Sequence, residues 1–407
     1  MLFAVSKKAN KLWGLKLRPC VKVLPNPNEN TALWAICWVT FLWSMASLMV
    51  FSLLPFFLTE ELMVSKTKLG LIEGTAVFLA FVAKVFSGLL SDIFKTRRSL
   101  IIVGTIGSVA MKPLFACATG LWSVFLAKSL DRISKGIRSG PADAHIADIT
   151  PQTHHGSSYG MRFSLENAGM VLGGALASGL YYVTNSYRAV FWCAMIPGIC
   201  ALAVLYRYVH DNKAIRKNVA WHWSEVRMLP KRYWQILGGI FILMLTRFDP
   251  SFLNLRAREF SWKIELIPLL MVGYYIVSAN TAWPIGKLAD RTNRLKVFLA
   301  GLIVMILANI ILIVAPNKWW IVAGFLVVGL HMGMTHGMIS TLIAENTLPH
   351  LRGTAFAIYY LIAGISLLIG NSTAGFLAES ITAGAFYGGS IFASLAGVYF
   401  YILSKHE

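Results

Sequence analysis

Twelve apolar segments, each long enough to cross a membrane, constrain this chain more than any other feature of its sequence. A helix needs about 20 predominantly apolar residues to span a hydrocarbon core. Such segments lie at 31–58, 70–91, 99–119, 121–144, 157–184, 188–207, 234–254, 266–286, 297–316, 319–345, 353–378 and 384–404. Only 14% of the chain is charged, against about 25% in a soluble domain. We therefore expect an all-α integral membrane protein with twelve transmembrane helices.

The Lys and Arg residues of the loops predict how these helices are oriented. With the N-terminus inside, 22 of them fall in cytoplasmic segments and 7 in outer loops. Cytoplasmic loops of membrane proteins carry an excess of basic residues. Both termini are therefore expected in the cytoplasm, with the protein in the inner or plasma membrane. The same distribution explains the net charge of +19 without nucleic acid as a partner.

The longest interior loop divides the twelve segments into two sets of six. We expect a cytoplasmic tail over 1–30, a six-helix half over 31–207, a linker over 208–233 and a second half over 234–407. The halves echo each other, because Ile146-Ala147-Asp148 recurs as Ile343-Ala344-Glu345 after 197 residues. Two such halves, with a binding site between them, form a transporter architecture.

The fourth segment carries charges where a membrane span should be apolar. At 3.6 residues per turn, five of them form one stripe along a helix: Lys128, Asp131, Arg132, Lys135 and Arg138. A charge at the bilayer centre costs roughly 2.5–3.5 kcal/mol on insertion scales, so this face must turn towards other helices or water. The charges either pair and hold the bundle together or line a pathway for ions or substrate, and we favour the pathway.

Other charged residues extend this predicted pathway. Arg162 and Glu166 are one helical turn apart and are expected to pair. Arg247 and Asp249 precede a proline in the seventh segment, which either breaks the helix or only kinks it. The carboxylates of Asp131 and Glu166 are expected to couple transport to protons, although a permanent ion pair needs the same residues.

The predicted spans hold more bases than acids. The eight bases are Lys84, Lys112, Lys128, Arg132, Lys135, Arg138, Arg162 and Arg247, and the five acids are Glu73, Asp131, Asp143, Glu166 and Asp249. If every acid pairs, three cations remain, and an uncompensated buried charge is unfavourable. An anion can neutralise them, because arginine binds carboxylate or phosphate with two parallel hydrogen bonds. We expect an organic anion or zwitterion as substrate, with Arg132, Arg162 and Lys128 as its ligands.

Two loop motifs carry a resemblance to a known family. They resemble the signature Gly-x-x-x-Asp-(Arg/Lys)-x-Gly-(Arg/Lys)-(Arg/Lys) of the major facilitator superfamily, with departures at Ile93, Lys95 and Asn293. The resemblance implies that family's fold of two six-helix halves and transport by alternating access. The motif residues are expected to latch the cytoplasmic side shut, although ordinary topology-setting charges look the same. They are Gly88, Asp92, Arg97 and Arg98 in the first copy and Gly286, Asp290, Arg291 and Arg294 in the second. The glycines are expected to let helices approach closely.

The fourth and fifth segments narrow the resemblance. Asp131-Arg132, Lys135-Gly136-Ile-Arg138 and Pro141-x-Asp143-Ala144 look like a bacterial branch of poorly characterised permeases. Arg132-x-x-x-Gly136 is also similar to a motif of proton-coupled antiporters, but Gly169-Met-Val-Leu-Gly173-Gly174 lacks the proline that those antiporters carry. We expect a proton-coupled secondary transporter of a small solute, with a multidrug or siderophore efflux antiporter as the alternative.

A membrane receptor or enzyme that does not transport is the alternative from another class. The sequence contains no P-loop, no GxSxG and no paired Cys/His metal spacing. We therefore expect no enzyme, no catalytic residues, no metal and no cofactor. His331 and His336 are five residues apart, so they do not form a metal pair. The expected partners are the solute, a coupling proton and the lipid bilayer, and the expected working unit is a monomer.

Overall fold

The computed structural model describes residues 31–93, 96–150, 155–209, 223–348 and 351–405, and every regular element within these ranges is helical. All twelve predicted segments are helical there. Nine helices in the described ranges are long and apolar enough to cross a membrane. The other three crossings are those of the predicted segments 121–144, 157–184 and 234–254. The all-α fold is therefore confirmed.

The helix bounds follow the predicted segments closely. The first half of the chain contains α2 (Thr31–Phe51), α3 (Leu54–Phe56), η2 (Phe57–Glu61), α4 (Lys66–Ile93), α5 (Arg98–Ala116), α6 (Leu121–Ile149), α7 (His155–Thr184), α8 (Tyr187–Cys193) and α9 (Met195–Tyr208). The second half contains η4 (Trp223–Met228), α10 (Lys231–Leu245), α11 (Ser251–Glu259), η5 (Ile264–Leu266), α12 (Ile267–Arg291), α13 (Arg294–Val314), α14 (Lys318–Glu345), α15 (Arg352–Ser380) and α16 (Gly384–Lys405). Half of the predicted linker, residues 210–222, and the whole predicted tail lie outside the described residues.

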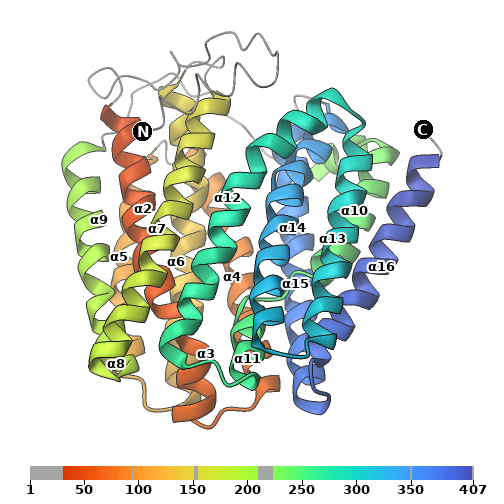
Figure 1. The fold of residues 1–407 in the computed structure, drawn as a ribbon. Helices are drawn as coiled ribbons and strands as arrows, with labels where there is room; N and C mark the ends of the chain where they lie inside the picture. The colour runs from red at the N-terminus through yellow and green to blue at the C-terminus, as the bar shows by residue number, and fades with distance from the viewer. Residues whose placement is uncertain (1–30, 94–95, 151–154, 210–222, 349–350, 406–407) are drawn as a thin grey trace, which may run out of the picture.

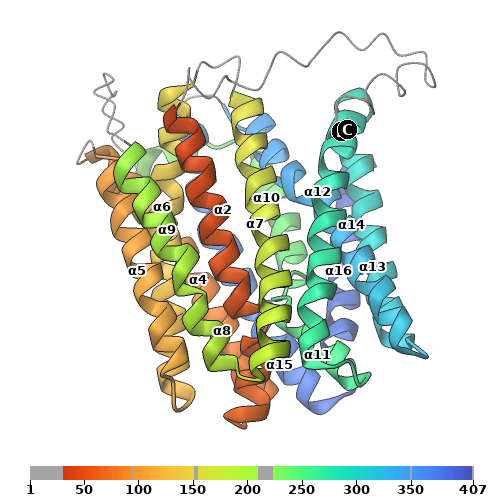
Figure 2. The same ribbon diagram turned by 60° about the vertical axis from the view of Figure 1, so that its left-hand side comes forward.

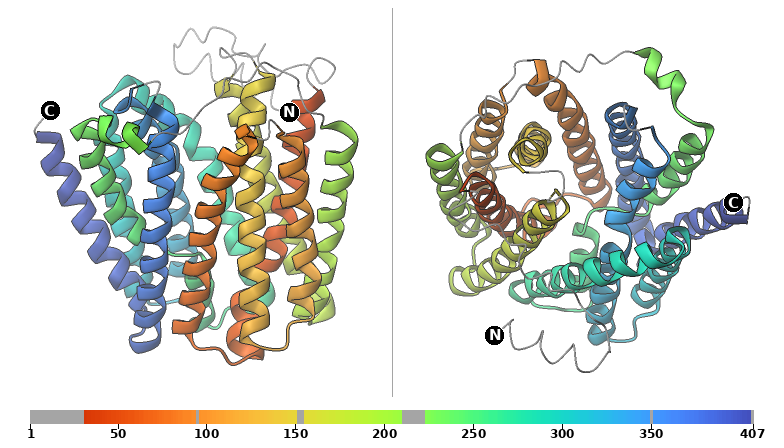
Figure 3. Two further views of the ribbon diagram at one scale, coloured as in Figure 1. Left: turned by 180° about the vertical axis from the view of Figure 1, so that it is seen from behind. Right: turned by 90° about the horizontal axis from the view of Figure 1, so that it is seen from above.

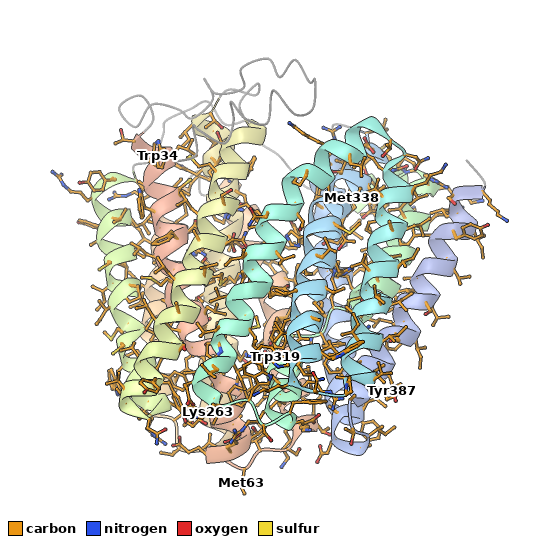
Figure 4. The ribbon with its side chains drawn as sticks, viewed as in Figure 1. Trp34, Met63, Lys263, Trp319, Met338 and Tyr387 are labelled. Atoms are coloured by element: carbon orange, nitrogen blue, oxygen red, sulfur yellow. The ribbon has the colours of Figure 1, made fainter. Side chains whose placement is uncertain are left out.

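The long helices stand side by side as one bundle (Figures 1 and 2). Viewed along the bundle, the helices from α2 to α9 form one group and those from α10 to α16 form another (Figure 3). Figure 4 shows Trp34 at one end of the bundle and Met63 with Lys263 at the other. We call these the Trp34 end and the Met63 end. Helix α2 begins and α16 ends at the Trp34 end (Figure 1).

Buried apolar side chains pack differently at the two ends of the bundle. The largest core cluster contains residues of both groups, such as Phe56 and Phe115 of the first and Phe252 and Phe325 of the second. Its members lie towards the Met63 end. Towards the Trp34 end, the buried core residues form two separate clusters, one in each group. The two groups therefore share a buried core at the Met63 end, whereas partly buried residues such as Val77 and Phe81 of α4 pack against the cluster of the second group.

Glycines bring α4 of the first group against α15 of the second. A Cβ atom at Gly70 would lie 2.3 Å from the Asn371 carbonyl oxygen, and one at Gly74 would lie 2.8 Å from that of Leu368. Neither position can hold a side chain unless a backbone moves. The expectation for Gly88 and Gly286 was wrong, because a Cβ at either would meet nothing within 4 Å. Glycines of α6 face α4 instead. A Cβ at Gly136 would lie 2.4 Å from the Ala80 carbonyl oxygen, and one at Gly140 would lie 3.1 Å from that of Lys84.

The seventh crossing is interrupted rather than kinked. Helix α10 ends at Leu245 and α11 begins at Ser251, directly after Pro250. The Asp249 amide, freed from the helix, donates to Asn371 Oδ1 over 2.7 Å. Proline lacks an amide hydrogen and its ring clashes with the preceding turn, which explains the break. The break carries Asp249 and Ser251 to the interface between the two groups.

Candidate transport pathway

Six charged side chains form what we call the paired layer: Glu73, Lys112, Lys128, Asp131, Arg132 and Asp249. Lys112 Nζ lies 3.0 Å from Asp131 Oδ1, and Lys128 forms an ion pair with Glu73. These four side chains are at most 1% exposed. Arg132 Nη2 lies 3.9 Å from Asp249 Oδ2, across the two groups of helices. Three bases therefore face three acids in this layer.

Hydrogen bonds tie the paired layer to neighbouring helices. Ser108 Oγ donates to Asp131 Oδ1 over 2.6 Å and accepts from Trp43 Nε1 at 2.9 Å. Buried polar groups are costly unless they have such partners. Asp131 is thus held by α5 within one group of helices. The geometry is that of a fixed ion pair, which was the alternative to a coupling role for this residue.

Aromatic rings of α2 cover the basic stripe of α6. The Phe51 ring centre lies 4.4 Å from Arg132 Cζ and 4.9 Å from Lys128 Nζ. The Trp43 ring centre lies 4.2 Å from Arg138 Cζ. A cation over an aromatic face is attracted by the ring quadrupole, by about 0.5–2 kcal/mol. These contacts explain how several like charges stay on one helix face inside the bundle.

The remaining charges form what we call the cationic cluster: Lys84, Lys135, Arg138, Asp143, Arg162, Glu166 and Arg247. Asp143 forms ion pairs with two bases, with Arg162 Nη2 2.9 Å from Oδ1 and Lys84 Nζ 3.4 Å from Oδ2. Lys84 Nζ also lies 4.4 Å from the Tyr360 ring centre, on α15 of the other group. This contact places the cluster at the interface between the groups.

Three cations of this cluster have no carboxylate within 4 Å among the described residues: Lys135, Arg138 and Arg247. The Nε atoms of Arg138 and Arg247 are buried and lack a hydrogen-bond acceptor there, as does that of Arg162. Arg247 donates from Nη2 to Thr335 Oγ1. A buried donor without an acceptor is unfavourable, so these guanidinium groups are suited to an added anionic ligand.

Glu166 has no ion pair within 4 Å in the described structure, although cations surround it. The expected pair with Arg162 is wrong, because Arg162 turns to Asp143 on α6. Lys135, Arg138 and Arg162 are all close enough to interact with the Glu166 carboxylate electrostatically. Glu166 thus has no fixed ion-pair partner among the described residues, which distinguishes it from Asp131.

The charge excess predicted from the sequence lies outside the paired layer. That layer has three bases and three acids, whereas the cationic cluster has five bases and only the two acids Asp143 and Glu166. The three surplus cations therefore all belong to the cationic cluster. Lys128, expected as a ligand for the substrate, forms an ion pair with Glu73 instead. The sequence could not reveal this division, because it depends on which helices face each other.

Two histidines of α14 lie beside the cationic cluster. His331 Nδ1 lies 2.8 Å from the Gly301 carbonyl oxygen, so it is a hydrogen-bonded interior histidine. The His336 ring stacks on Phe163 of α7, with ring centres 6.1 Å apart. This stack joins the two groups of helices at the level of Glu166 and Arg247, with which His336 interacts electrostatically. The sequence offered no signal for the stack.

The loop motifs produce a matched ion pair in each half of the chain. Arg97 Nε lies 3.2 Å from Asp148 Oδ2, and Arg294 pairs with Glu345. Arg294 follows Arg97 by 197 residues, and Glu345 follows Asp148 by the same number, so the two halves repeat the contact as well as the sequence. Arg98 donates to the Tyr206 carbonyl oxygen over 2.9 Å. The side chains of Asp92, Asp290 and Arg291 lie outside the described residues.

These features define a polytopic membrane protein in which two helix groups meet at a charged, mid-membrane interface, the design of a transporter. A profile of the Major Facilitator Superfamily matches residues 36–254 and 236–407. The chain belongs to this superfamily of membrane transporters. The resemblance seen in the loop motifs is thereby confirmed.

Known relatives span nearly the whole chain. An uncharacterized MFS-type transporter of Methanocaldococcus jannaschii is 25% identical over 387 residues, which are 92% of this chain and 96% of the relative. The multidrug resistance protein MdtG of Salmonella dublin is 24% identical over 383 residues, 90% of this chain and 92% of MdtG. A solved bacterial homolog of the human lysosomal transporter Spinster, inward-facing and occupied, aligns with a TM-score of 0.76 at 13% identity. That alignment covers 94% of this chain and 98% of the other, and it shows the likeness of the fold.

Proposed function

We propose that this protein is a proton-coupled secondary transporter of a small organic anion, or of a zwitterion with an acidic group. The observation that carries the proposal is the surplus of three cations in the cationic cluster. Arg138, Arg162 and Arg247 each keep a buried guanidinium nitrogen without an acceptor. A carboxylate or phosphate supplies both the charge and the lone pairs that these groups lack.

The substrate is proposed to bridge the two groups of helices. Arg162 and Arg138 belong to α7 and α6 of the first group, whereas Arg247 follows α10 of the second. A ligand that bonds to both sides is bound best when they are close, so it biases the conformational equilibrium. This is the differential contact that alternating access requires.

The protein is proposed to alternate by opening one end of the bundle as it closes the other. Ion pairs cross between the groups at the Met63 end, with Arg258 Nε 2.6 Å from Glu60 Oε1 and Lys66 Nζ 2.7 Å from Glu259 Oε1. The shared apolar core lies at the same end. With both termini in the cytoplasm, this state is open towards the inside. The pairs of Arg97 with Asp148 and of Arg294 with Glu345 are formed in this state, each within one half of the chain.

Ligand binding to the purified protein tests the substrate class. A panel of organic carboxylates and phosphates is compared with lipophilic cations such as tetraphenylphosphonium, and thermal stabilisation is measured at fixed pH. A ligand at 100 times its Kd stabilises by about 2.7 kcal/mol, which is readily measured. We expect stabilisation by anions, and its loss in Arg162→Ala and Arg247→Ala. Arg188→Ala is the matched control, because Arg188 pairs with Glu61 at the Met63 end.

Two results would contradict the anion proposal. Tight binding of lipophilic cations that is undiminished in Arg162→Ala and Arg247→Ala would assign the surplus charge to structure and favour multidrug efflux. If Arg188→Ala lost as much anion binding as Arg162→Ala and Arg247→Ala, the loss would not be specific to the cationic cluster. Anion binding that depends on the two cluster arginines alone supports the proposal.

A further inference from the structure

One hydroxyl group is shared by two carboxylates from opposite groups of helices. Ser251 Oγ lies 2.6 Å from Asp249 Oδ1 and 3.0 Å from Glu73 Oε1. Asp249 and Ser251 flank Pro250 at the break before α11, whereas Glu73 belongs to α4. We call this contact the serine bridge. Glu73 and Ser251 are at most 2% exposed, so bulk water does not mediate it.

The hydrogens available at the serine bridge do not suffice for two ionised carboxylates. A hydroxyl has one hydrogen to donate, and an ionised carboxylate has none. With both acids ionised, one of the two short oxygen–oxygen contacts has no hydrogen between its atoms and is repulsive. One added proton resolves this, because a protonated carboxyl donates to Ser251 Oγ, which donates its own hydrogen to the other carboxylate.

A second observation points to the same missing proton. Glu73 Oε2 is buried and has no hydrogen-bond partner among the described residues. An ionised carboxylate spreads its charge over both oxygens, so burying one without a donor is costly. The groups that face the two acids are Lys128 and Arg132 from α6 and the phenols of Tyr274 and Tyr275 from α12. Lys128 already bonds to the other oxygen, Glu73 Oε1.

We propose that the serine bridge binds a coupling proton and that release of this proton opens the Met63 end. Binding forms one O–H bond on a carboxylate, and release returns that proton to water. Without it, Glu73 and Asp249 repel across Ser251, and α4 separates from α11. The ion pairs of Lys66 and Arg258 close the same end, so the bridge and these pairs open together. This inference rests on the proposed function in one respect: the solute whose transport the proton drives is the one proposed there.

Spin labels across the Met63 end test the proposal without any substrate. Nitroxides are attached at Met63→Cys and Lys263→Cys, on opposite groups, in a background in which the native cysteines are replaced by serine. Distances between them are measured over a pH titration. We expect the distance to lengthen as pH rises in the wild type. Glu73→Gln and Asp249→Asn imitate the protonated acid and are expected to stay closed at every pH. Glu61→Gln, which removes a carboxylate paired with Arg188 within one group, is expected to respond like the wild type.

A second measurement keeps the proposal testable if the amide variants do not fold. The infrared band of a buried protonated carboxyl is recorded for the wild type and for Ser251→Ala, which keeps both acids and removes only the shared hydroxyl. We expect the band in the wild type at low pH and a displaced titration in Ser251→Ala. An unchanged titration in Ser251→Ala, or an unchanged label response in Glu73→Gln and Asp249→Asn, would overturn the proposal. Because no substrate is present, either result leaves the anion proposal to be decided by its own binding test.

Discussion

At the residue scale, the same side-chain types have two different tasks in one membrane-buried region. Lys112 and Asp131 satisfy each other in a pair that is fully buried within one group of helices. Arg247 and Glu166 have no oppositely charged partner within 4 Å in the described structure. The first arrangement is an ion pair without net charge, whereas the second leaves charged groups that the proposed anion and proton would complete. The two kinds of charged residue are distinguished by whether they have an ion-pair partner and not by how deeply they are buried.

Removing one partner of the buried pair should destabilise the fold. Lys112→Met leaves Asp131 as an uncompensated buried charge, which costs about 3–5 kcal/mol. We expect a large fall in thermal stability of the purified protein. The double variant Lys112→Met/Asp131→Leu should recover most of it, because neither charge remains. A double variant as unstable as Lys112→Met would show that the pair has a role beyond neutralising itself.

Glu166 should matter for coupling and not for folding. Glu166→Gln removes the titrating group and keeps the shape of the side chain, and no ion pair within 4 Å is lost among the described residues. In vesicles, we expect exchange of a transported anion to continue while accumulation driven by a pH gradient is lost. Asp131→Asn should instead lower stability, because it leaves Lys112 unpaired. Unchanged pH-driven accumulation in Glu166→Gln would remove this residue from the coupling path.

At the element scale, glycines decide where helices of the two groups can meet. Helices in a bilayer gain little from the hydrophobic effect, so they associate through close packing of small residues. Gly70 and Gly74 place α4 against the backbone of α15 at the Met63 end. The glycine of the loop motif, Gly88, has open space around it. The motif glycines therefore do not close this state of the protein.

A side chain at Gly70 should force the Met63 end apart. Gly70→Val places a branched side chain where a Cβ alone would lie 2.3 Å from the Asn371 carbonyl oxygen and 2.9 Å from Gly375 Cα. Overpacking of this kind costs about 1–3 kcal/mol. The distance between labels at Met63→Cys and Lys263→Cys should lengthen at all pH values. Gly179→Val is the control, because a Cβ there meets nothing within 4 Å. Equal label distances in both variants would contradict the role of this contact.

At the scale of the whole molecule, the two groups of helices share one buried core at the Met63 end and have separate buried clusters towards the Trp34 end. The shared core and the ion pairs at the Met63 end act together, so one cannot be lost without loosening the other. In the proposed cycle each end of the bundle opens in turn, so the charged residues at mid-depth lie where the two groups change their distance least.

Reporter fusions test which end faces the cytoplasm. The distribution of basic loop residues predicts that Lys263 and Glu379 are external and that Arg216 and Arg294 are internal. Lys263 lies at the Met63 end (Figure 4), so this end should be accessible from outside the cell. Phosphatase fusions at the first pair and fluorescent fusions at the second should be active. An external reading at Arg294 would invert the topology and with it the assignment of the open side.

The sequence by itself determined the features that depend on local composition and spacing. Twelve apolar segments require twelve helices, because a backbone in lipid must satisfy its hydrogen bonds within each segment. The charged face of α6 could be predicted from helical spacing, and the surplus of cations from simple counting. The interruption at Pro250 was one of two outcomes that the sequence allowed, since proline restricts only its own neighbourhood.

Only the tertiary structure decided which charges meet. Arg162 is one turn from Glu166 but bonds to Asp143, because α6 brings a second carboxylate closer than the helix's own next turn. Glu73 was counted among the acids, yet its contact with Ser251 joins residues 178 positions apart. Such contacts depend on which helices pack against each other, and the sequence alone does not specify that packing. The physical reason is that Coulomb and hydrogen-bond energies fall off within a few ångströms, so distances in space and not in the chain decide whether a charge is paired.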